Sequence, residues 1–252
     1  MTGSLLSFIL GAILYGTLTI LPLFLQSLLG YPAINSGMAI MPRGIGAFIS
    51  FAVAGALSNK MDFRLQIGLG FIFLAVSNFM LGNVNLNMSQ DSIIIPNIIS
   101  GFALGFIFIP MTTAAFVTLN KNQIARGSTG ILNLLRNVGG GIGTAAVSTF
   151  LVRNAQSHQS YMVSKLTPYN HIFQQKLQAT QHFLSQHIDI VAAAHKSSAL
   201  IYNQLLQQSN LFSYVDNFRL FGLICLIMIP SSFLFKKIKT TKKDNSEKST
   251  EN

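Results

Sequence analysis

The chain has no tryptophan, one cysteine and only seven acidic residues among its 252 residues. The single cysteine, Cys225, excludes an intrachain disulfide and a cysteine metal cluster. Charged residues make up 10% of the chain, which is too few for the surface of a soluble domain of this length. Hydrophobic residues make up 50%, and mostly apolar runs of about twenty residues recur along the sequence. This composition is typical of an integral membrane protein.

The formal net charge of +10 raises the question of a nucleic-acid partner, but the cations are not spread evenly. Six of the seventeen lie in the last seventeen residues, after an apolar run: Lys236, Lys237, Lys239, Lys242, Lys243 and Lys248. Lysines in that position are typical of a segment that anchors the end of a membrane helix in the cytoplasm. We therefore expect no nucleic-acid binding, and we interpret residues 236–252 as a basic cytoplasmic tail.

The apolar runs predict six transmembrane helices and an all-α integral membrane fold. The predicted spans are Ser4–Leu29, Ala33–Ser58, Gln66–Gly82, Ile93–Leu119, Gly130–Leu151 and Leu211–Phe235. Five of them lie within residues 1–152, and the sixth occupies residues 211–235. The first residues, MTGSLLSF, lack the basic region of a cleavable signal, so we expect the first span to be retained.

The short loops indicate the orientation in the cell membrane, because loops rich in Lys and Arg stay on the cytoplasmic side. The loops at 59–65 and 120–128 each contain one Lys and one Arg, whereas those at 30–32 and 83–92 contain neither. Both termini are therefore predicted to be cytoplasmic. The long segment 153–210 is predicted to be extracytoplasmic.

That outer segment is polar and contains all five histidines. Hydrophobic residues recur in two pieces of it, from Ile172 to Leu184 and from Ile188 to Leu206, which predicts two short amphipathic helices lying on the outer face. The histidines at 182, 187 and 195 have spacings that do not place a ligand pair on one helix face, so we expect no metal and no cofactor. They have no acidic partners in a recognisable motif, and an enzyme is therefore the least favoured class.

Two arginines lie deep inside predicted spans. Arg136 follows Ser128 by ~12 Å of helix, and Arg43 follows Ala33 by ~15 Å, so both lie near the middle of a hydrocarbon core of ~30 Å. A charge at that depth should face a bundle interior or a water-filled cavity. Each arginine could bind substrate or could satisfy neighbouring backbone carbonyls, and the sequence leaves both interpretations open.

Small residues recur around these arginines. Gly101 and Gly105, like Gly139 and Gly143, have the spacing that lets two membrane helices pack closely. With Asn133 and Arg136, the second glycine pair forms one polar and small stripe along a helix. None of the seven acidic residues lies deep in a span, so the chain offers no membrane-embedded carboxylate for proton coupling.

Three stretches resemble a known family. The loop after the second span carries Gly55, Lys60, Asp62 and Arg64, the fourth span reads GFALGFIFIPMTT, and the fifth contains NLLRNVGGG. The loop resembles a degenerate copy of the cytoplasmic loop signature of the major facilitator superfamily. Together the three stretches resemble the C-terminal half of the fourteen-span drug:proton antiporters, the EmrB/QacA type. The fold that this resemblance implies is one six-helix half-bundle.

The resemblance implies multidrug export driven by proton influx, with alternating access between two six-helix bundles. It implies that the first, second, fourth and fifth spans line the substrate cavity. The candidate cavity residues are Gln26, Arg43, Phe108, Met111, Thr112, Asn133 and Arg136. The family implies amphipathic or cationic toxic compounds, but two buried arginines without a buried acid make anionic or neutral lipophiles equally suited to these walls.

The implied partners are membrane lipid, an N-terminal transporter half, small lipophilic substrates and, in a cell with an outer membrane, a periplasmic membrane-fusion adaptor. Only one of the family's two bundles is represented in the sequence. The alternative hypothesis is therefore a non-transporting membrane scaffold, or the product of a truncated or split gene that needs an N-terminal half.

Overall fold

All the secondary structure in the described part of the chain is helical. The computed structural model describes every residue except 1, 59, 90, 119–127, 168 and 234–252, and it leaves undescribed the side chains of 2–6, 113–118, 128–129, 131–132 and 231–233. The elements are α1 (Thr2–Leu23), the π-helix η1 (Phe24–Leu28), α2 (Ala33–Ile40), α3 (Pro42–Leu57), α4 (Phe63–Leu81), α5 (Asp91–Thr118), α7 (Ser128–Val163), α8 (His171–Ser185) and α9 (Ile190–Phe233).

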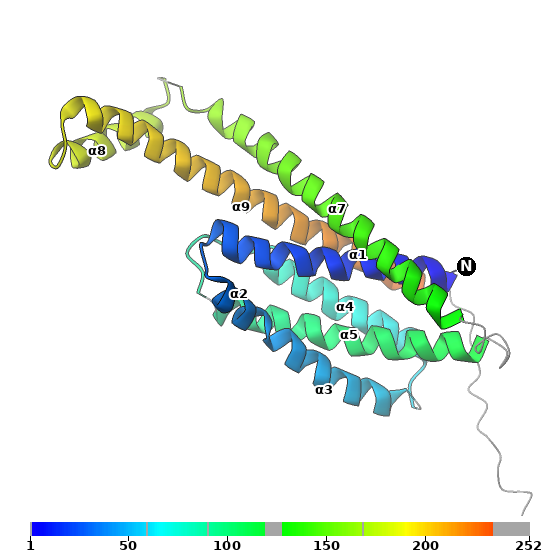
Figure 1. The fold of residues 1–252 in the computed structure, drawn as a ribbon. Coiled ribbons are helices and arrows are strands. Elements are labelled where there is room, and N and C mark those ends of the chain that lie inside the picture. The colour runs from blue at the N-terminus through cyan, green and yellow to red at the C-terminus, as the bar shows by residue number, and fades with distance from the viewer. Residues whose placement is uncertain (1, 59, 90, 119–127, 168, 234–252) are drawn as a thin grey trace, which may run out of the picture.

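The long helices form one bundle, in which α2 and α3 together make a single bent rod (Figure 1). Helix α1 packs along α7, and α3 packs along α5. Helix α4 contacts both α5 and α9, and α9 also contacts α7, so the chain of packed neighbours runs α3, α5, α4, α9, α7, α1. The predicted all-α membrane half-bundle is confirmed.

Five stretches are long and apolar enough to cross a membrane: Ser7–Leu28, Ala33–Leu57, Phe63–Leu81, Asp91–Thr112 and Ile190–Pro230. Helix α7 is not among them, although it packs into the bundle beside α1. Its glycines, Asn133 and Arg136 dilute its apolar character. The predicted fifth span, Gly130–Leu151, therefore forms as part of a helix of the bundle, but hydropathy alone does not identify it.

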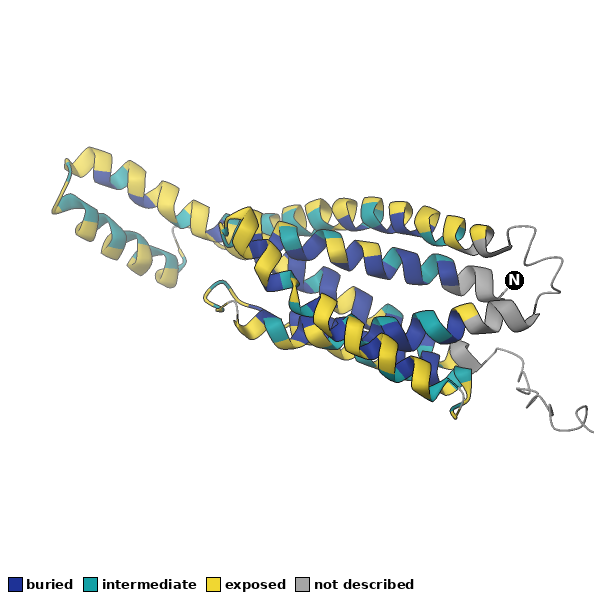
Figure 2. Ribbon diagram, turned by 60° about the horizontal axis from the view of Figure 1, so that its bottom comes forward, coloured by how far each residue is buried: buried dark blue, intermediate teal, exposed yellow. Residues whose placement is uncertain are grey.

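The bundle interior is apolar and tightly packed. Phe24, Phe71 and Phe218 are its largest fully buried side chains, and they come from three different elements. Figure 2 shows that buried residues gather on the helix faces turned toward one another. Because lipid tails are as apolar as these side chains, such a bundle is held by close packing and by hydrogen bonds between helices. Gln66 Nε2, for example, donates to the carbonyl of Ala54 at 2.8 Å.

The rod formed by α2 and α3 bends at Met41, immediately before Pro42. Proline has no N–H and its ring crowds the preceding turn, so it interrupts the helical hydrogen bonds. Asn97 of α5 donates to the carbonyl of Ala39, at 3.0 Å, just before the bend. The bend therefore has a packing partner on α5, and it places Arg43 in the first turn of α3.

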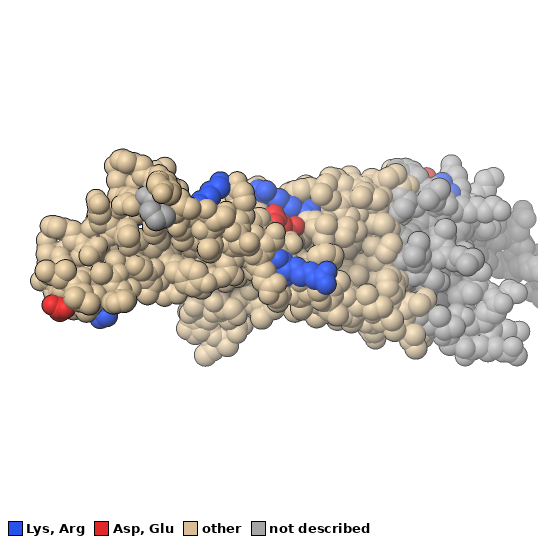
Figure 3. Space-filling model, turned by 90° about the horizontal axis from the view of Figure 1, so that it is seen from above, with Lys and Arg blue, Asp and Glu red and all other residues tan. Residues whose placement is uncertain are grey.

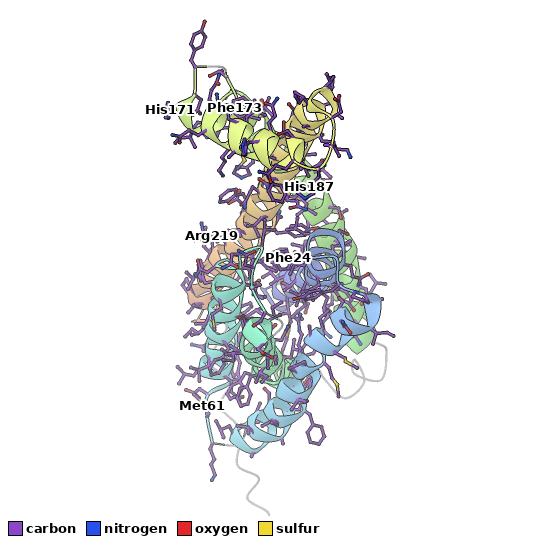
Figure 4. All side chains as sticks on the ribbon, turned by 90° about the vertical axis from the view of Figure 1, so that its left-hand side faces the viewer. Phe24, Met61, His171, Phe173, His187 and Arg219 are labelled. Carbon is purple, nitrogen blue, oxygen red and sulfur yellow. The ribbon has the colours of Figure 1, made fainter. Side chains whose placement is uncertain are left out.

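The outer segment differs from the expectation of two short helices. Only α8 is short, because α7 continues to Val163 and α9 already begins at Ile190. In Figure 1 these two long helices run beyond the bundle and carry α8 at their far end. Figure 4 shows His171, Phe173 and His187 in this projecting part, apart from Phe24 and Arg219 in the bundle.

Contacts between α7 and α9 explain why the polar segment stays helical. The Ser209 hydroxyl donates to the carbonyl of Ala155 at 2.5 Å, and the Ser213 hydroxyl donates to that of Leu151 at 2.5 Å. His158 Nε2 lies 2.7 Å from a carboxylate oxygen of Asp216. Because these contacts join two separate segments, the sequence of either segment alone does not predict them.

On the face shown in Figure 3, most charged atoms gather in a band, and the described surface of the bundle next to it is uncharged.

Candidate functional site

A cavity of about 650 Å³ lies where α1 and α7 face the rod of α2 and α3 and the helix α5. These helices correspond to the first, second, fourth and fifth predicted spans. The lining residues are Leu14, Tyr15, Leu18, Ile40, Arg43, Gly44, Ala47, Leu104, Phe108, Asn133, Arg136 and Asn137. The walls are thus apolar side chains interrupted by two guanidinium groups, two amides and one phenol.

Arg43 is the most deeply buried charged residue of this cavity. Its residue exposure is 5%, and its Nη2 atom has no hydrogen-bond partner in the described structure. Its backbone is held in place by Gly101 of α5, where an added Cβ would collide with the carbonyl oxygen of Arg43. A buried donor without a partner is energetically unfavourable, by about 1–3 kcal/mol, so the burial of Arg43 carries a cost that the described structure does not offset with a hydrogen bond to Nη2.

Arg136 has a partner on the opposite wall of the cavity. Its Cζ atom lies 4.2 Å from the centre of the Phe108 ring, so the guanidinium of α7 stacks on an aromatic side chain of α5. This cation–π contact is attractive because the ring face carries negative electrostatic potential. The Nε atom of Arg136 is buried and has no hydrogen-bond partner in the described structure. Arg136 therefore connects two walls of the cavity while keeping a donor free.

Four of the seven predicted cavity residues line this cavity: Arg43, Phe108, Asn133 and Arg136. The other three do not. Gln26 donates to the Ser36 hydroxyl at 3.3 Å, and the Met111 sulfur accepts from Ser7 at 4.0 Å. The Thr112 hydroxyl donates to carbonyls of its own helix at 2.9 and 3.0 Å, so it is occupied locally.

Sequence reasoning missed Tyr15 and Asn137 as cavity residues. The Tyr15 hydroxyl donates to the Asn137 side-chain oxygen at 3.3 Å, which links α1 to α7 at the cavity wall. Asn137 lies next to Arg136 in the sequence, so a search for polar residues around the buried arginine would have found it. Nothing in the sequence separates Tyr15 from the other aromatic residues of the first span.

The predicted packing glycines lie at close helix crossings. A Cβ at Gly101 or Gly105 of α5 would overlap atoms of α3, and one at Gly139 or Gly143 of α7 would overlap the backbone of α1. Gly11 of α1 lies in the same way against the carbonyl of Arg136. These approaches bring the two pairs of helices together on either side of the cavity, and they fix the positions of both arginines.

The loop motif lies at the end of the bundle where α3 passes to α4. Asp62 precedes α4 without a side-chain cap, and Arg64 lies 6.0 Å from the ring centre of Phe63. A Cβ at Gly55 would meet only the Ile109 side chain, at 3.8 Å. That is an ordinary van der Waals distance, so a small side chain would have room at Gly55. Lys60 lies on the exposed turn between the helices.

Comparison with known proteins identifies the family. A family model described as Major Facilitator Superfamily matches residues 2–144, more than half of the chain. The chain therefore belongs to the major facilitator superfamily and is a multi-pass membrane protein. The predicted family is confirmed.

Three curated relatives show which branch it resembles. The fatty acid resistance protein FarB of Neisseria gonorrhoeae is 29% identical over 229 residues, covering 90% of this chain and 43% of FarB. The probable multidrug resistance protein EmrY of Escherichia coli is 27% identical over 214 residues, covering 84% of this chain and 40% of EmrY. The multidrug export protein EmrB of the same species is 29% identical over 157 residues, covering 62% and 30%. The chain thus spans less than half the length of these relatives.

Proposed function

We propose that this chain forms one of the two helical bundles of an exporter that moves lipophilic toxic compounds across the cell membrane by proton antiport. The observation that carries the proposal is the cavity of about 650 Å³ between α1, α3, α5 and α7. Its volume and its apolar walls with a few polar groups suit a drug-sized ligand. The relatives named for multidrug and fatty acid resistance support the same substrate range.

A second bundle, from an N-terminal transporter half, is the partner that this proposal requires. Helix α3 exposes Phe48 at 80%, and α7 exposes Leu134 at 60%, a surface suited to contact with further helices or lipid. The apolar span Ala33–Leu57, which contains α3, is only 22% buried, against 50–56% for the other four apolar spans. The cavity lining contains no Asp or Glu. We therefore assign the proton-titrating carboxylate to the second bundle.

The proposed arrangement places both termini and the loop around Lys60 in the cytoplasm. It places outside the projecting hairpin of residues 153–210, which contains α8 and the outer ends of α7 and α9. In a cell with an outer membrane, this hairpin is the part of the chain that a periplasmic membrane-fusion adaptor would reach. The amphipathic compounds themselves would reach the cavity from the lipid. The competing hypothesis is a membrane scaffold that does not transport.

Dye efflux from a pump-deficient host separates these hypotheses. The chain expressed alone should give no efflux, because it lacks both a membrane-embedded carboxylate and a second bundle. Co-expression with an eight-span N-terminal half should restore efflux, and an uncoupler should abolish it. Uncoupler-sensitive efflux by the chain alone would contradict the proposal. A persistent lack of efflux from the co-expressed pair, with both halves in the membrane, would favour the scaffold.

A further inference from the structure

We infer that a second, smaller pocket binds the uncharged, hydroxyl-rich headgroup of a membrane lipid, such as a glycosyl diacylglycerol. The pocket has a volume of about 300 Å³ and lies between η1, α7 and α9. It shares no lining residue with the larger cavity. The inference concerns binding at this pocket alone and does not depend on the proposed export.

The first argument is the position of the pocket along the bundle. Its apolar lining comes from Leu28, Leu151, Val152 and Ala155. Leu28 ends the apolar stretch of the first span, and Leu151 ends the predicted fifth span, just before the hairpin leaves the bundle. The pocket thus lies where the apolar spans give way to the polar outer segment, which is the level of the lipid headgroups. A lipid can place its headgroup in the pocket and keep its acyl chains beside the apolar spans.

The second argument is the chemistry of the polar lining. It consists of amide and hydroxyl side chains, from Ser27, Gln156, Gln159, Asn210 and Tyr214. None of the lining residues is charged, so a phosphate or ammonium group would enter without a counter-charge. Amides and hydroxyls both donate and accept hydrogen bonds, as the hydroxyls of a sugar or a glycerol do. The lining therefore favours an uncharged headgroup with several hydroxyls.

The third argument is the hydroxyl of Tyr214. This residue is 5% exposed, and buried tyrosine hydroxyls usually have a hydrogen-bond partner. In the described part of the chain the Tyr214 hydroxyl has none, yet it is not fully buried either. Because Tyr214 lines the pocket, its remaining exposure is toward the pocket. The ring lies edge-on to Phe24, with 5.4 Å between the ring centres, so packing holds the hydroxyl in place before a ligand binds.

The fourth argument is the local structure of the two facing walls. Ser27 and Leu28 belong to η1, the π-helical turn that ends the first span, and such turns are rare and occur frequently at functional sites. On the facing wall, Gln159 Nε2 donates to the Tyr202 hydroxyl at 2.8 Å. This bond orients the amide of Gln159 and leaves its oxygen as an acceptor. Both walls therefore present polar groups to a headgroup in the pocket.

Native mass spectrometry of the full chain can count bound lipids and compare headgroups. The protein in lauryldimethylamine oxide would be titrated separately with glucosyl dioleoylglycerol, dioleoyl phosphatidylcholine and dioleoyl phosphatidylglycerol at the same molar ratio. The three lipids share their acyl chains, so a difference in retention reports on the headgroup, and the detergent carries no sugar that could compete. Tyr214→Phe removes only the hydroxyl and keeps the ring against Phe24. The matched control is Tyr169→Phe, at a residue of the outer segment that is 97% exposed.

We expect one tightly held copy of the glucosyl lipid per chain, with retention about fivefold above that of either phospholipid. Tyr214→Phe should lower this retention several-fold, because the headgroup loses one hydrogen bond in the pocket. Tyr169→Phe should leave it unchanged. Methyl glucoside at millimolar concentration should not displace the lipid, because binding also requires the acyl chains beside the apolar lining.

Equal retention of the glucosyl lipid and phosphatidylcholine would overturn the inference, and this comparison does not depend on the folding of any variant. Retention of phosphatidylglycerol equal to that of the glucosyl lipid would also overturn it, since the pocket would then accept a charge. Displacement by methyl glucoside would show that the ligand is a soluble sugar rather than a lipid. Unchanged retention in Tyr214→Phe, with unchanged helical circular dichroism, would exclude this pocket as the binding site. None of these results bears on the proposed export, which dye efflux tests.

Discussion

At the scale of single residues, glycines decide how closely the cavity-lining helices approach. Gly101→Ala should destabilise the bundle by about 1–3 kcal/mol, because the new methyl group would collide with the backbone carbonyl of Arg43. The matched control is Gly141→Ala, where no atom lies within 4 Å of the added Cβ. Thermal unfolding followed by circular dichroism in the same detergent would compare them. Equal midpoints for the two variants would show that the close crossing is not needed.

A second prediction at the scale of single residues concerns Arg136. In a transporter restored by an N-terminal half, Arg136→Ala should leave protein levels near normal but nearly abolish efflux, because the contact with Phe108 and the free Nε donor disappear together. Arg136→Lys should keep partial activity, since lysine keeps the charge but loses the planar fork. Efflux assays with membrane protein quantified by immunoblot would measure both. Normal efflux by Arg136→Ala would remove this arginine from the mechanism, and loss of the protein would indicate a structural role.

At the scale of elements, the bend between α2 and α3 sets the position of Arg43. Pro42→Ala would restore a backbone N–H at the bend and favour a straight helix. We expect uncoupler-sensitive dye efflux by the chain co-expressed with an N-terminal half to fall several-fold, at unchanged protein levels in the membrane, because the arginine shifts relative to α5. Pro230→Ala is the control, since Pro230 lies inside α9 and does not line the cavity. Unchanged efflux in Pro42→Ala would show that packing on α5 alone holds the bend.

The hairpin of α7, α8 and α9 shows how an element can extend beyond its apolar part. Both long helices continue past the predicted ends of their spans, joined by Ser209, Ser213 and the pair of His158 and Asp216. The side chains of that pair are 33% and 40% exposed, so the pair itself contributes little, about 0–1 kcal/mol. The continuous helical backbone and the repeated serine contacts are the features that hold the hairpin together.

At the scale of the whole molecule, the loop charges predict one orientation in the membrane. In a Cys225→Ser background, a cysteine at Ser157 should react with an impermeant reagent in intact cells, and a cysteine at Ser246 should react only after lysis. The reason is the concentration of Lys and Arg in loops predicted to be cytoplasmic. Mass-tagging of the labelled protein gives the readout. Labelling at Ser246 from outside would reverse the topology.

The sequence by itself determined the helical membrane fold, the family and the presence of two arginines deep in the spans. It did so because hydropathy, loop charge and small-residue spacing are local properties, readable without knowing which helices touch. The same patterns placed Arg43, Asn133 and Arg136 among the cavity candidates, because a charge or amide in an apolar span must face the interior. Phe108 was a candidate only through the resemblance to the family.

Only the tertiary structure decided which candidates share a cavity. Gln26, Met111 and Thr112 have suitable chemistry, but their hydrogen bonds lie elsewhere, and Tyr15 joins the cavity only because α1 packs on α7. The sequence also did not predict the full length of α7 and α9, since the polar ends of these helices are stabilised by contact with each other. The stacking of Arg136 on Phe108 joins residues of two helices, and pairing across helices depends on a geometry that no local pattern encodes.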